Sequence, residues 1–159
     1  MRRVATTALA LLLPAAPCAG EERHGTFYLY GYVNHLEPTP QTNQGNMRYF
    51  GLSRELRRDK WRFDTGFATY VDSYRVRSYS VFSDISHDDY ALRYLRPMLS
   101  LQCQSKGHTY SSEDRQFLCF PLPKLRIGGD AGPLVNLSGT PKVGRLTNGF
   151  AVAEFGIRW

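Results

Sequence analysis

Aromatic and aliphatic residues alternate with polar residues along most of this chain, and this period of two limits its possible folds more than any other feature. In the segment 61–71, Trp61 and Phe63 lie on one side of the alternation, and Arg62 and Asp64 lie on the other. A period of two places successive side chains on opposite faces of a β-strand. No convincing helical period of 3.6 residues follows the N-terminal region. The pattern therefore predicts an all-β protein.

Eight segments of this kind follow one another along the chain. They cover residues 26–35, 46–56, 60–71, 76–85, 91–103, 116–127, 133–139 and 148–159, of which the seventh is short. Short turn-forming stretches at 57–59, 128–130 and 144–148 suit antiparallel neighbours. Eight antiparallel strands can close the smallest membrane barrel, which leaves no unpaired edge in lipid. We therefore expect an eight-stranded antiparallel up-and-down transmembrane β-barrel.

A soluble β-sandwich or a lipocalin-like barrel would show the same alternation, with its apolar face turned inward. Three features favour the membrane. The chain begins with an export signal, and it ends on an aromatic residue, Trp159, after an alternating segment. The mixed face also carries charges that a small soluble core would leave unpaired, namely Arg48, Arg62, Asp64 and Arg93.

The first 20 residues have the layout of a secretory signal peptide. Arg2 and Arg3 precede a short apolar run at 8–13, and small residues follow it. The run is too short, and too soon interrupted by proline, to span a bilayer as a helix. We expect cleavage that leaves one domain over 21–159. Lipid attachment at Cys18 is the alternative, which the proline directly before that cysteine disfavours.

The charge balance fits a membrane better than a nucleic acid. The chain has 20 basic and 14 acidic residues, and loss of the two signal arginines leaves 18 against 14, or +4. This excess suits contact with lipid phosphates, although solubility charge on loops would look the same. No lysine-rich tail or basic helix indicates nucleic acid. We expect a monomer without a nucleic-acid partner.

Two cysteines, Cys103 and Cys119, remain after the signal, near the ends of successive predicted strands. An even count in an exported protein is compatible with one disulfide, which would close the loop between them, but the sequence leaves the pairing open. His108 is the only nearby imidazole and no CxxC spacing occurs, so we expect no metal or other cofactor. The clustered carboxylates are expected in a solvated loop rather than around calcium: Asp84, Asp88 and Asp89.

His35, Asp72 and Ser73 are the candidate catalytic residues. His35 ends the first predicted strand, and the Asp-Ser pair follows the third. In an up-and-down barrel these two strand ends lie at the same rim. A His, an acid and a hydroxyl can together make a hydroxyl nucleophilic, and a membrane lipid would be the substrate. However, Asp-Ser is also a common turn pair, and a histidine at a strand end is usually a surface residue.

Four stretches occur in order along the chain: Tyr32-Val33-Asn34-His35; Phe50-Gly51-Leu52-Ser53-Arg54, followed by Trp61; Val71-Asp72-Ser73-Tyr74; and Phe120-Pro121-Leu122-Pro123, followed by Gly132-Pro133-Leu134-Val135 and Pro141. Together they resemble the PagP family of outer-membrane lipid A palmitoyltransferases. The resemblance implies a barrel in the bacterial outer membrane that moves a palmitoyl chain from a phospholipid donor to lipid A or lipopolysaccharide. It also implies that His35, Asp72 and Ser73 are essential, with His35 the best candidate general base.

The chain departs from that family in two places. Only residues 21–25 precede the first predicted strand, too few for the amphipathic helix of the best-known members. The two cysteines are not part of the family pattern either. Acyl-chain length depends on which residue closes the floor of the barrel, which the sequence does not identify, so that length stays open. A non-enzymatic outer-membrane barrel and a soluble periplasmic lipid-binding barrel are the alternative functions.

Two further features bear on a lipid-binding role. Pro121, Pro123 and Pro141 lack an N–H and would weaken pairing between strands, either as a lateral gate for lipid chains or as a simple bulge. Small or uncharged residues follow Asp64 on its side of the third strand, at 66, 68 and 70. We expect them to leave room for an acyl chain in the lumen.

Overall fold

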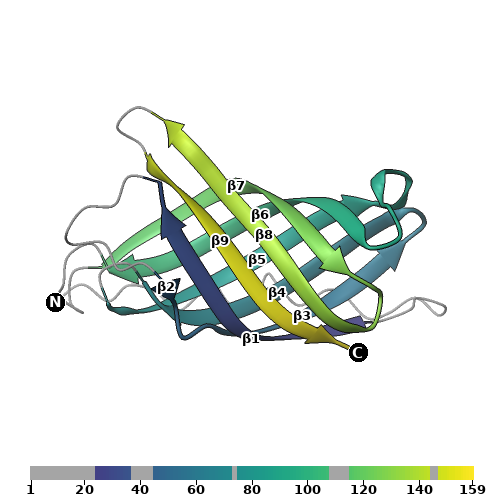
Figure 1. Cartoon of the computed structure of the whole chain (residues 1–159), viewed down its shortest axis with the longest axis horizontal. Helices are drawn as coiled ribbons and strands as arrows, with labels where there is room; N and C mark the ends of the chain where they lie inside the picture. Colours follow the sequence, from purple (N-terminus) through teal and green to yellow (C-terminus); the bar gives the residue numbers. More distant parts are fainter. Residues whose placement is uncertain (1–23, 37–44, 73–74, 108–114, 144–146) are drawn as a thin grey trace, which may run out of the picture.

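The computed structural model describes residues 24–36, 45–72, 75–107, 115–143 and 147–159. The signal peptide and Cys18 lie outside these residues. The elements, drawn in Figure 1, are β1 (His24–His35), β2 (Gly45–Asn46), β3 (Phe50–Arg58), β4 (Trp61–Val71), β5 (Arg77–His87), a 3-10 helix η1 (Asp88–Tyr90), β6 (Leu95–Gly107), β7 (Arg115–Gly128), β8 (Gly132–Val143) and β9 (Thr147–Arg158). In the part of the chain that is described, no helix is long and apolar enough to cross a membrane.

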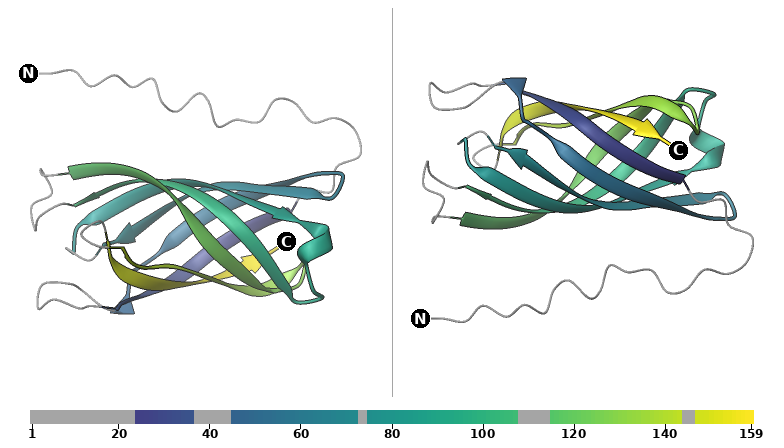
Figure 2. Two further views of the ribbon diagram at one scale, coloured as in Figure 1. Left: turned by 90° about the horizontal axis from the view of Figure 1, so that it is seen from above. Right: turned by 90° about the horizontal axis from the view of Figure 1, so that it is seen from below.

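The eight long strands form one closed antiparallel barrel. Each pairs with its neighbours in chain order from β3 to β9, and β1 pairs with both β3 and β9 to close the ring. The two-residue β2 adds to β1 beside β3. Figure 2 shows the strands wrapping obliquely around this barrel. The predicted eight-stranded up-and-down barrel is confirmed.

The barrel has two different rims. The terminal rim is the end where β1 begins and β9 ends, and there Gly25 and Trp159 exchange backbone hydrogen bonds of 2.9 and 3.0 Å. The turn at 59–60 and the connections 88–94 and 129–131 also lie at this rim. The loop rim is the opposite end, where β1 and β4 end and β5 and β7 begin.

The predicted segments agree with the strands to within about two residues at each end, apart from three segments, of which 91–103 also stops short of Gly107, where β6 ends. The predicted strand 91–103 was wrong at its start, because residues 91–94 form a turn closed by a bridge between Leu92 and Leu95. The short predicted segment 133–139 is a full strand, since β8 pairs with β9 over most of its length. The predicted segment 46–56 is interrupted at residues 47–49.

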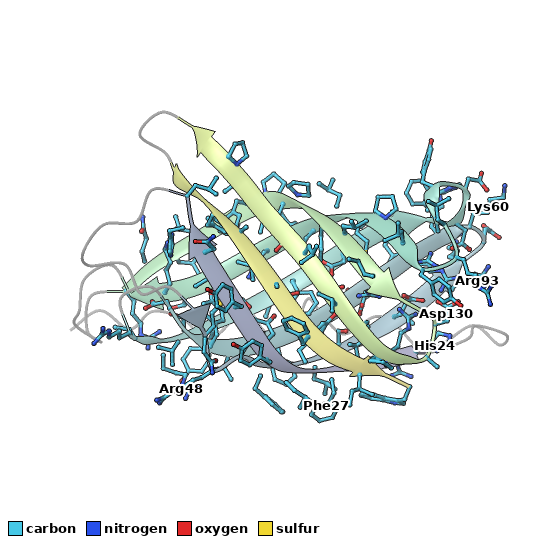
Figure 3. All side chains as sticks on the ribbon, viewed as in Figure 1. His24, Phe27, Arg48, Lys60, Arg93 and Asp130 are labelled. Carbon is cyan, nitrogen blue, oxygen red and sulfur yellow. A yellow bond between two sulfur atoms is a disulfide. The ribbon has the colours of Figure 1, made fainter. Side chains whose placement is uncertain are left out.

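The barrel is polar inside and apolar outside. On β4, Arg62 and Asp64 are only 6% and 2% exposed, whereas Trp61 and Phe67 on the other face are 48% and 51% exposed. Figure 3 shows the outward direction of Phe27. Other exposed apolar side chains continue this surface over all the long strands: Leu29, Tyr32, Phe50, Tyr79, Leu99, Leu101, Phe117, Ile127, Leu137, Phe155 and Ile157. This distribution identifies a membrane-spanning barrel rather than a soluble one.

Two of the four charges expected on the mixed face lie elsewhere. Arg62 and Asp64 do point into the lumen, where other charges surround them. Arg48 and Arg93 are exposed and lie outside the strands, with Arg48 at a positive φ of 46° between β2 and β3. The alternation could not place these two, because strand parity has no meaning in a connection.

Candidate functional site

A network of ion pairs crosses the lumen in the half nearer the terminal rim. Arg126 Nη2 lies 2.6 Å from Asp64 Oδ2, and Lys124 Nζ lies 3.0 Å from Asp84 Oδ2. All four residues are at most 6% exposed. Asp84 therefore lies inside the barrel, and its expected place in a solvated loop was wrong. These pairs link β7 to β4 and to β5, which are not its neighbours in the sheet. Separating them would leave a buried charge without a partner, which is costly.

A second group of charges spans the mouth at the terminal rim. Asp88 in η1 accepts hydrogen bonds of 2.7 Å from both Arg62 Nε and Arg96 Nη1. Arg62 also donates to Asp130 in the β7–β8 turn, at 2.8 Å. Burial alone would raise the pKa of Asp88, but the arginine hydrogen bonds and charges outweigh it and lower the pKa to about 2. Two turns are thereby tied across the end of the lumen.

An aromatic layer fills the middle of the lumen. The ring of Tyr28 packs edge-on against Tyr49 and Phe82, with centroids 6.2 and 6.0 Å apart, and Tyr49 stacks on Tyr70 at 5.9 Å. A Cβ added at Gly66 would lie 2.7 Å from the Phe82 ring. The room expected beside residues 66, 68 and 70 is thus largely occupied by rings.

A cavity lies between the aromatic layer and the loop rim. Its volume is about 90 Å³. Its polar lining includes His35, Asp72, Lys106 and Glu154, and Tyr49 donates a hydrogen bond of 3.0 Å to Glu154. The remaining lining residues are Val33, Met47, Tyr70, Gln102, Gln104, Phe120, Leu122, Ser138, Phe150 and Val152. The cavity is therefore apolar towards β7 and polar towards β6.

His35 and Asp72 line this same cavity, as the shared rim of β1 and β4 predicts. Ser73 lies outside the described residues, so the complete trio stays a prediction. In the part of the chain that is described, no three His, Cys, Asp or Glu side chains are grouped to hold a metal ion.

The carboxylate of Asp72 has a structural role that the sequence did not reveal. Its Oδ1 accepts from the Val76 N–H at 3.0 Å. Its Oδ2 accepts from Ser78 Oγ at 2.8 Å and from the Gly107 N–H at 2.7 Å. Asp72 thus closes the β4–β5 connection and ties it to β6. Tyr49, Lys106 and Glu154 were also missed as cavity residues. The inward positions of Lys106 and Glu154 follow from strand parity once the register is known, whereas Tyr49 lies in the connection before β3.

The wall beside the cavity is open between β7 and β8. Their ladder runs from Gly128↔Leu134 only as far as Lys124↔Ser138, whereas β7 stays paired with β6 up to Arg115. Residues 115–123 of β7 and 139–143 of β8 do not pair with each other, although each stretch pairs with the strand on its other side. We call these two stretches the β7–β8 seam. In Figure 1 the ends of these two strands at the loop rim lie apart. The seam contains Pro121, Pro123 and Pro141, the three prolines that were expected to weaken the pairing between strands.

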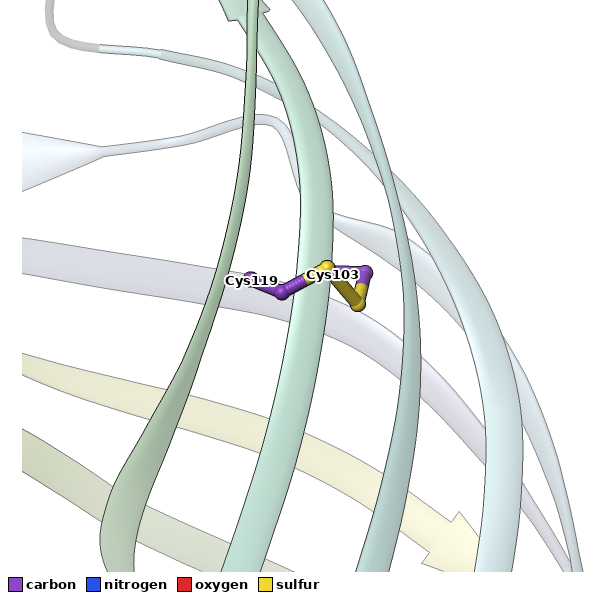
Figure 4. The surroundings of a disulfide bond; sticks show 2 residues. All are labelled: Cys103 and Cys119. Carbon is purple, nitrogen blue, oxygen red and sulfur yellow. A yellow bond between two sulfur atoms is a disulfide. The ribbon is translucent and has the colours of Figure 1, made fainter.

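A disulfide joins Cys103 and Cys119, which are directly opposed on β6 and β7 (Figure 4). The sequence had left this pairing open. The bond does more than close a loop, because it lies within the paired strands. Cys119 belongs to the seam stretch of β7, so the bond holds that stretch to its one paired neighbour.

Comparison with known proteins yields structural likeness only. No protein-family model matches the chain, and no curated protein matches it. Among solved structures, Neisserial surface protein A (NspA) has a TM-score of 0.42 and 15% identity, covering 87% of this chain and 97% of that one. The N-terminal β-barrel domain of Pseudomonas aeruginosa OprF has a TM-score of 0.49 and 12% identity, covering 88% of this chain and 100% of that domain.

Proposed function

We propose that this protein is a small barrel of the bacterial outer membrane that binds a lipid acyl chain in its loop-rim cavity. The chain would enter sideways from the bilayer through the β7–β8 seam. One observation carries the proposal: the ladder between β7 and β8 ends where Phe120, Leu122 and Ser138 line the cavity. An unpaired seam in lipid is costly unless something satisfies or covers it, so its presence beside an apolar cavity wall favours lipid access.

An outer-membrane location is supported by the architecture. Closed antiparallel barrels with an apolar exterior, aromatic residues towards both rims and short turns at one rim are the form in which β-proteins span that membrane. Here Trp61 and Trp159 lie near the terminal rim, and Tyr79 and Phe117 lie near the loop rim; all four are exposed. Residues 1–20 supply a signal-like sequence.

The same interior argues against a general pore. The ion pairs of Lys124 and Arg126 cross the lumen, and the rings of Tyr28 and Phe82 lie beside them. An eight-stranded barrel is only wide enough for its own side chains or one slender ligand. The cavity, at about 90 Å³, is smaller than the roughly 300–1,000 Å³ of typical ligand pockets. It fits the end of an acyl chain, or more if the seam side chains turn outward.

Acyl transfer is the second candidate function, and the shared position of His35 and Asp72 at this cavity favours it. In that reaction a hydroxyl of lipid A attacks the ester carbonyl of a phospholipid. A new ester forms, the old ester bond breaks, and a lysophospholipid leaves. His35 would accept the proton of the attacking hydroxyl and return it to the leaving oxygen. Asp72 would position the loop-rim turn that carries Ser73.

Lipid binding is tested with a phospholipid that carries a photoreactive group near the end of one acyl chain. After irradiation of the protein in bilayers, peptide mapping locates the labelled residues. We expect label on the inward-facing Phe120 and Leu122. Label confined to the outward-facing Phe117 and Leu125 would mean that the chain stays outside the wall and would overturn the proposal.

Acyl transfer is tested separately by mass spectrometry of lipid A from cells that express the chain. The reaction predicts an added acyl mass that disappears with His35→Ala and persists with the nearby outward substitution Asn34→Ala. An unchanged lipid A from cells with folded barrel would leave lipid binding as the function and remove the enzymatic candidate.

A further inference from the structure

A second apolar site lies on the outer wall of the barrel, near the terminal rim and away from the loop-rim cavity. We call it the wall groove. It has a volume of about 420 Å³. Its lining comes from β7, β8, β9 and the turn before β6: Tyr94, Ile127, Gly128, Pro133, Leu134, Val135, Phe155 and Gly156. Not one of these residues is charged.

The register explains why a groove forms here. Ile127, Val135 and Phe155 are successive partners across three strands, and their side chains point outward. In the next row Leu134 turns its side chain inward between Gly128 and Gly156. Directly paired residues share a face, so this whole row faces inward, places no side chain on the outer wall and is lower than the first row. Gly128 cannot easily change, because it has a φ of +144° and a Cβ there would lie 2.9 Å from Leu134.

A cation stands at the mouth of this groove. Tyr94 is held beside β7, since its carbonyl accepts a hydrogen bond of 2.9 Å from the Gly128 N–H. The guanidinium of Arg93 lies over the Tyr94 ring, 5.0 Å from its centroid. Arg93 is exposed, and Figure 3 places it at the terminal rim. Stacking uses the flat face of the guanidinium and leaves its N–H donors, which lie in the guanidinium plane, able to bind an anion.

The neighbouring acid does not cancel this charge. Asp130 lies in the adjacent turn, but it is already bound to Arg62 at 2.8 Å and lies 3.8 and 3.9 Å from Arg96 and Arg158. Arginine can bind a phosphate with two parallel hydrogen bonds. The site therefore combines an uncharged groove at acyl-chain depth with a cation at head-group depth.

We propose that the wall groove binds one glycerophospholipid of the leaflet at the terminal rim, with an acyl chain along the groove and the phosphate on Arg93. A phospholipid fits this site because its phosphate is attached next to its acyl chains, just as Arg93 lies next to the uncharged groove. The site is independent of the loop-rim cavity, from which it is separated by the barrel wall and by distance along β8.

The test is native mass spectrometry of the full chain, released from mild detergent after addition of phosphatidylglycerol. In the variant Val152→Trp, in which the loop-rim cavity is filled, we expect one retained lipid per barrel; the wild type can retain a second lipid in that cavity. Arg93→Ala should weaken retention about tenfold, the effect of losing one hydrogen bond to a charged group, and Arg93→Lys should weaken it less. Val135→Trp should abolish retention by filling the groove from outside.

Two controls make the result specific. Arg77→Ala at the loop rim should leave retention unchanged, and Val152→Trp should remove only the lipid held in the loop-rim cavity. Equal retention by the wild type, Arg93→Ala and Val135→Trp would overturn the proposal and indicate ordinary boundary lipid. Loss of all retained lipid with Val152→Trp alone would also overturn it and would place the retained lipid in the loop-rim cavity.

Discussion

Arg126 on β7 and Asp64 on β4 meet inside the barrel, with Arg126 Nη2 2.6 Å from Asp64 Oδ2, although β5 and β6 separate their strands in the sheet. The contact therefore crosses the lumen rather than following the wall. With Lys124 and Asp84 beside it, it closes the half of the barrel nearer the terminal rim. Only the half nearer the loop rim is left for a ligand.

Removal of Arg126 should destabilise the barrel strongly. Arg126→Ala leaves Asp64 buried without its cation, and breaking a buried pair from one side costs about 3–5 kcal/mol. Urea unfolding followed by tryptophan fluorescence in detergent micelles measures this loss. Arg58→Ala, at an exposed position, is the control and should stay within about 0.5 kcal/mol of the wild type. A loss below about 1 kcal/mol for Arg126→Ala would show that other groups compensate Asp64.

Gly66 should tolerate no side chain, because the neighbouring strand β3 and the Phe82 ring of the aromatic layer fill the space around it. A Cβ there would lie 2.4 Å from the Leu52 carbonyl oxygen and 2.6 Å from Ser53 Cβ. Gly66→Ala should therefore cost about 1–3 kcal/mol through overpacking. Gly129→Ala is the matched control, since the nearest atom to its Cβ would be 3.5 Å away. Equal unfolding midpoints for the two variants would contradict a packed middle layer.

The terminal rim should be sensitive to acid through Asp88. Its pKa falls from 3.8 to about 2 because the arginine hydrogen bonds and charges outweigh the effect of burial. A carboxyl whose pKa is lowered on folding stabilises the protein above its unfolded pKa, and this contribution is lost as the pH falls towards 2. Asp88→Asn should thus be less stable at neutral pH and lose less stability over that acid window. Parallel pH profiles of wild type and variant, from urea unfolding, would count against this assignment.

Loss of the disulfide should loosen the seam stretch of β7. Cys103 and Cys119 are 16 residues apart, and closing a loop of that size is worth about 3 kcal/mol. The variant with both cysteines replaced by serine should unfold at lower urea concentration. Its amide hydrogen exchange should rise most in 115–123, which has β6 as its only paired neighbour, and least in β4. A uniform rise across all strands would mean that the bond stabilises the barrel generally rather than the seam.

Strand parity explains how much of the fold the sequence can predict. The alternation around Arg62 and Asp64 gives both the strand and its two faces, because each of these inward polar residues follows an outward aromatic one. The predicted start at residue 91 fails, since an apolar residue such as Leu92 fits a turn beside the membrane as well as a strand. β8 was underestimated because Gly139 and Pro141 are poor strand residues, and pairing with β9 overrides that preference.

The order of the strands predicts which residues of the candidate site share a rim, but not their hydrogen-bond partners. His35 and Asp72 come together because β1 and β4 end at one rim, which follows from strand counting. The backbone partners of Asp72 depend on the register of β6, which brings Gly107 beside it. The aromatic layer and the pair of Lys124 with Asp84 depend on the barrel's closure, so no local pattern indicates them. Ser73 and acyl transfer stay predictions.

The most direct test of lipid binding in the lumen is photolabelling of a matched pair of tryptophan variants in bilayers. Val152→Trp fills the loop-rim cavity, whereas Ala151→Trp adds the same ring on the exposed outer face of β9. We predict that the phospholipid chain labels Phe120 and Leu122 in the wild type and in Ala151→Trp, and that this label disappears in Val152→Trp. Inward labelling that persists in Val152→Trp, or that never occurs in the wild type, would contradict a lipid-binding cavity behind the β7–β8 seam.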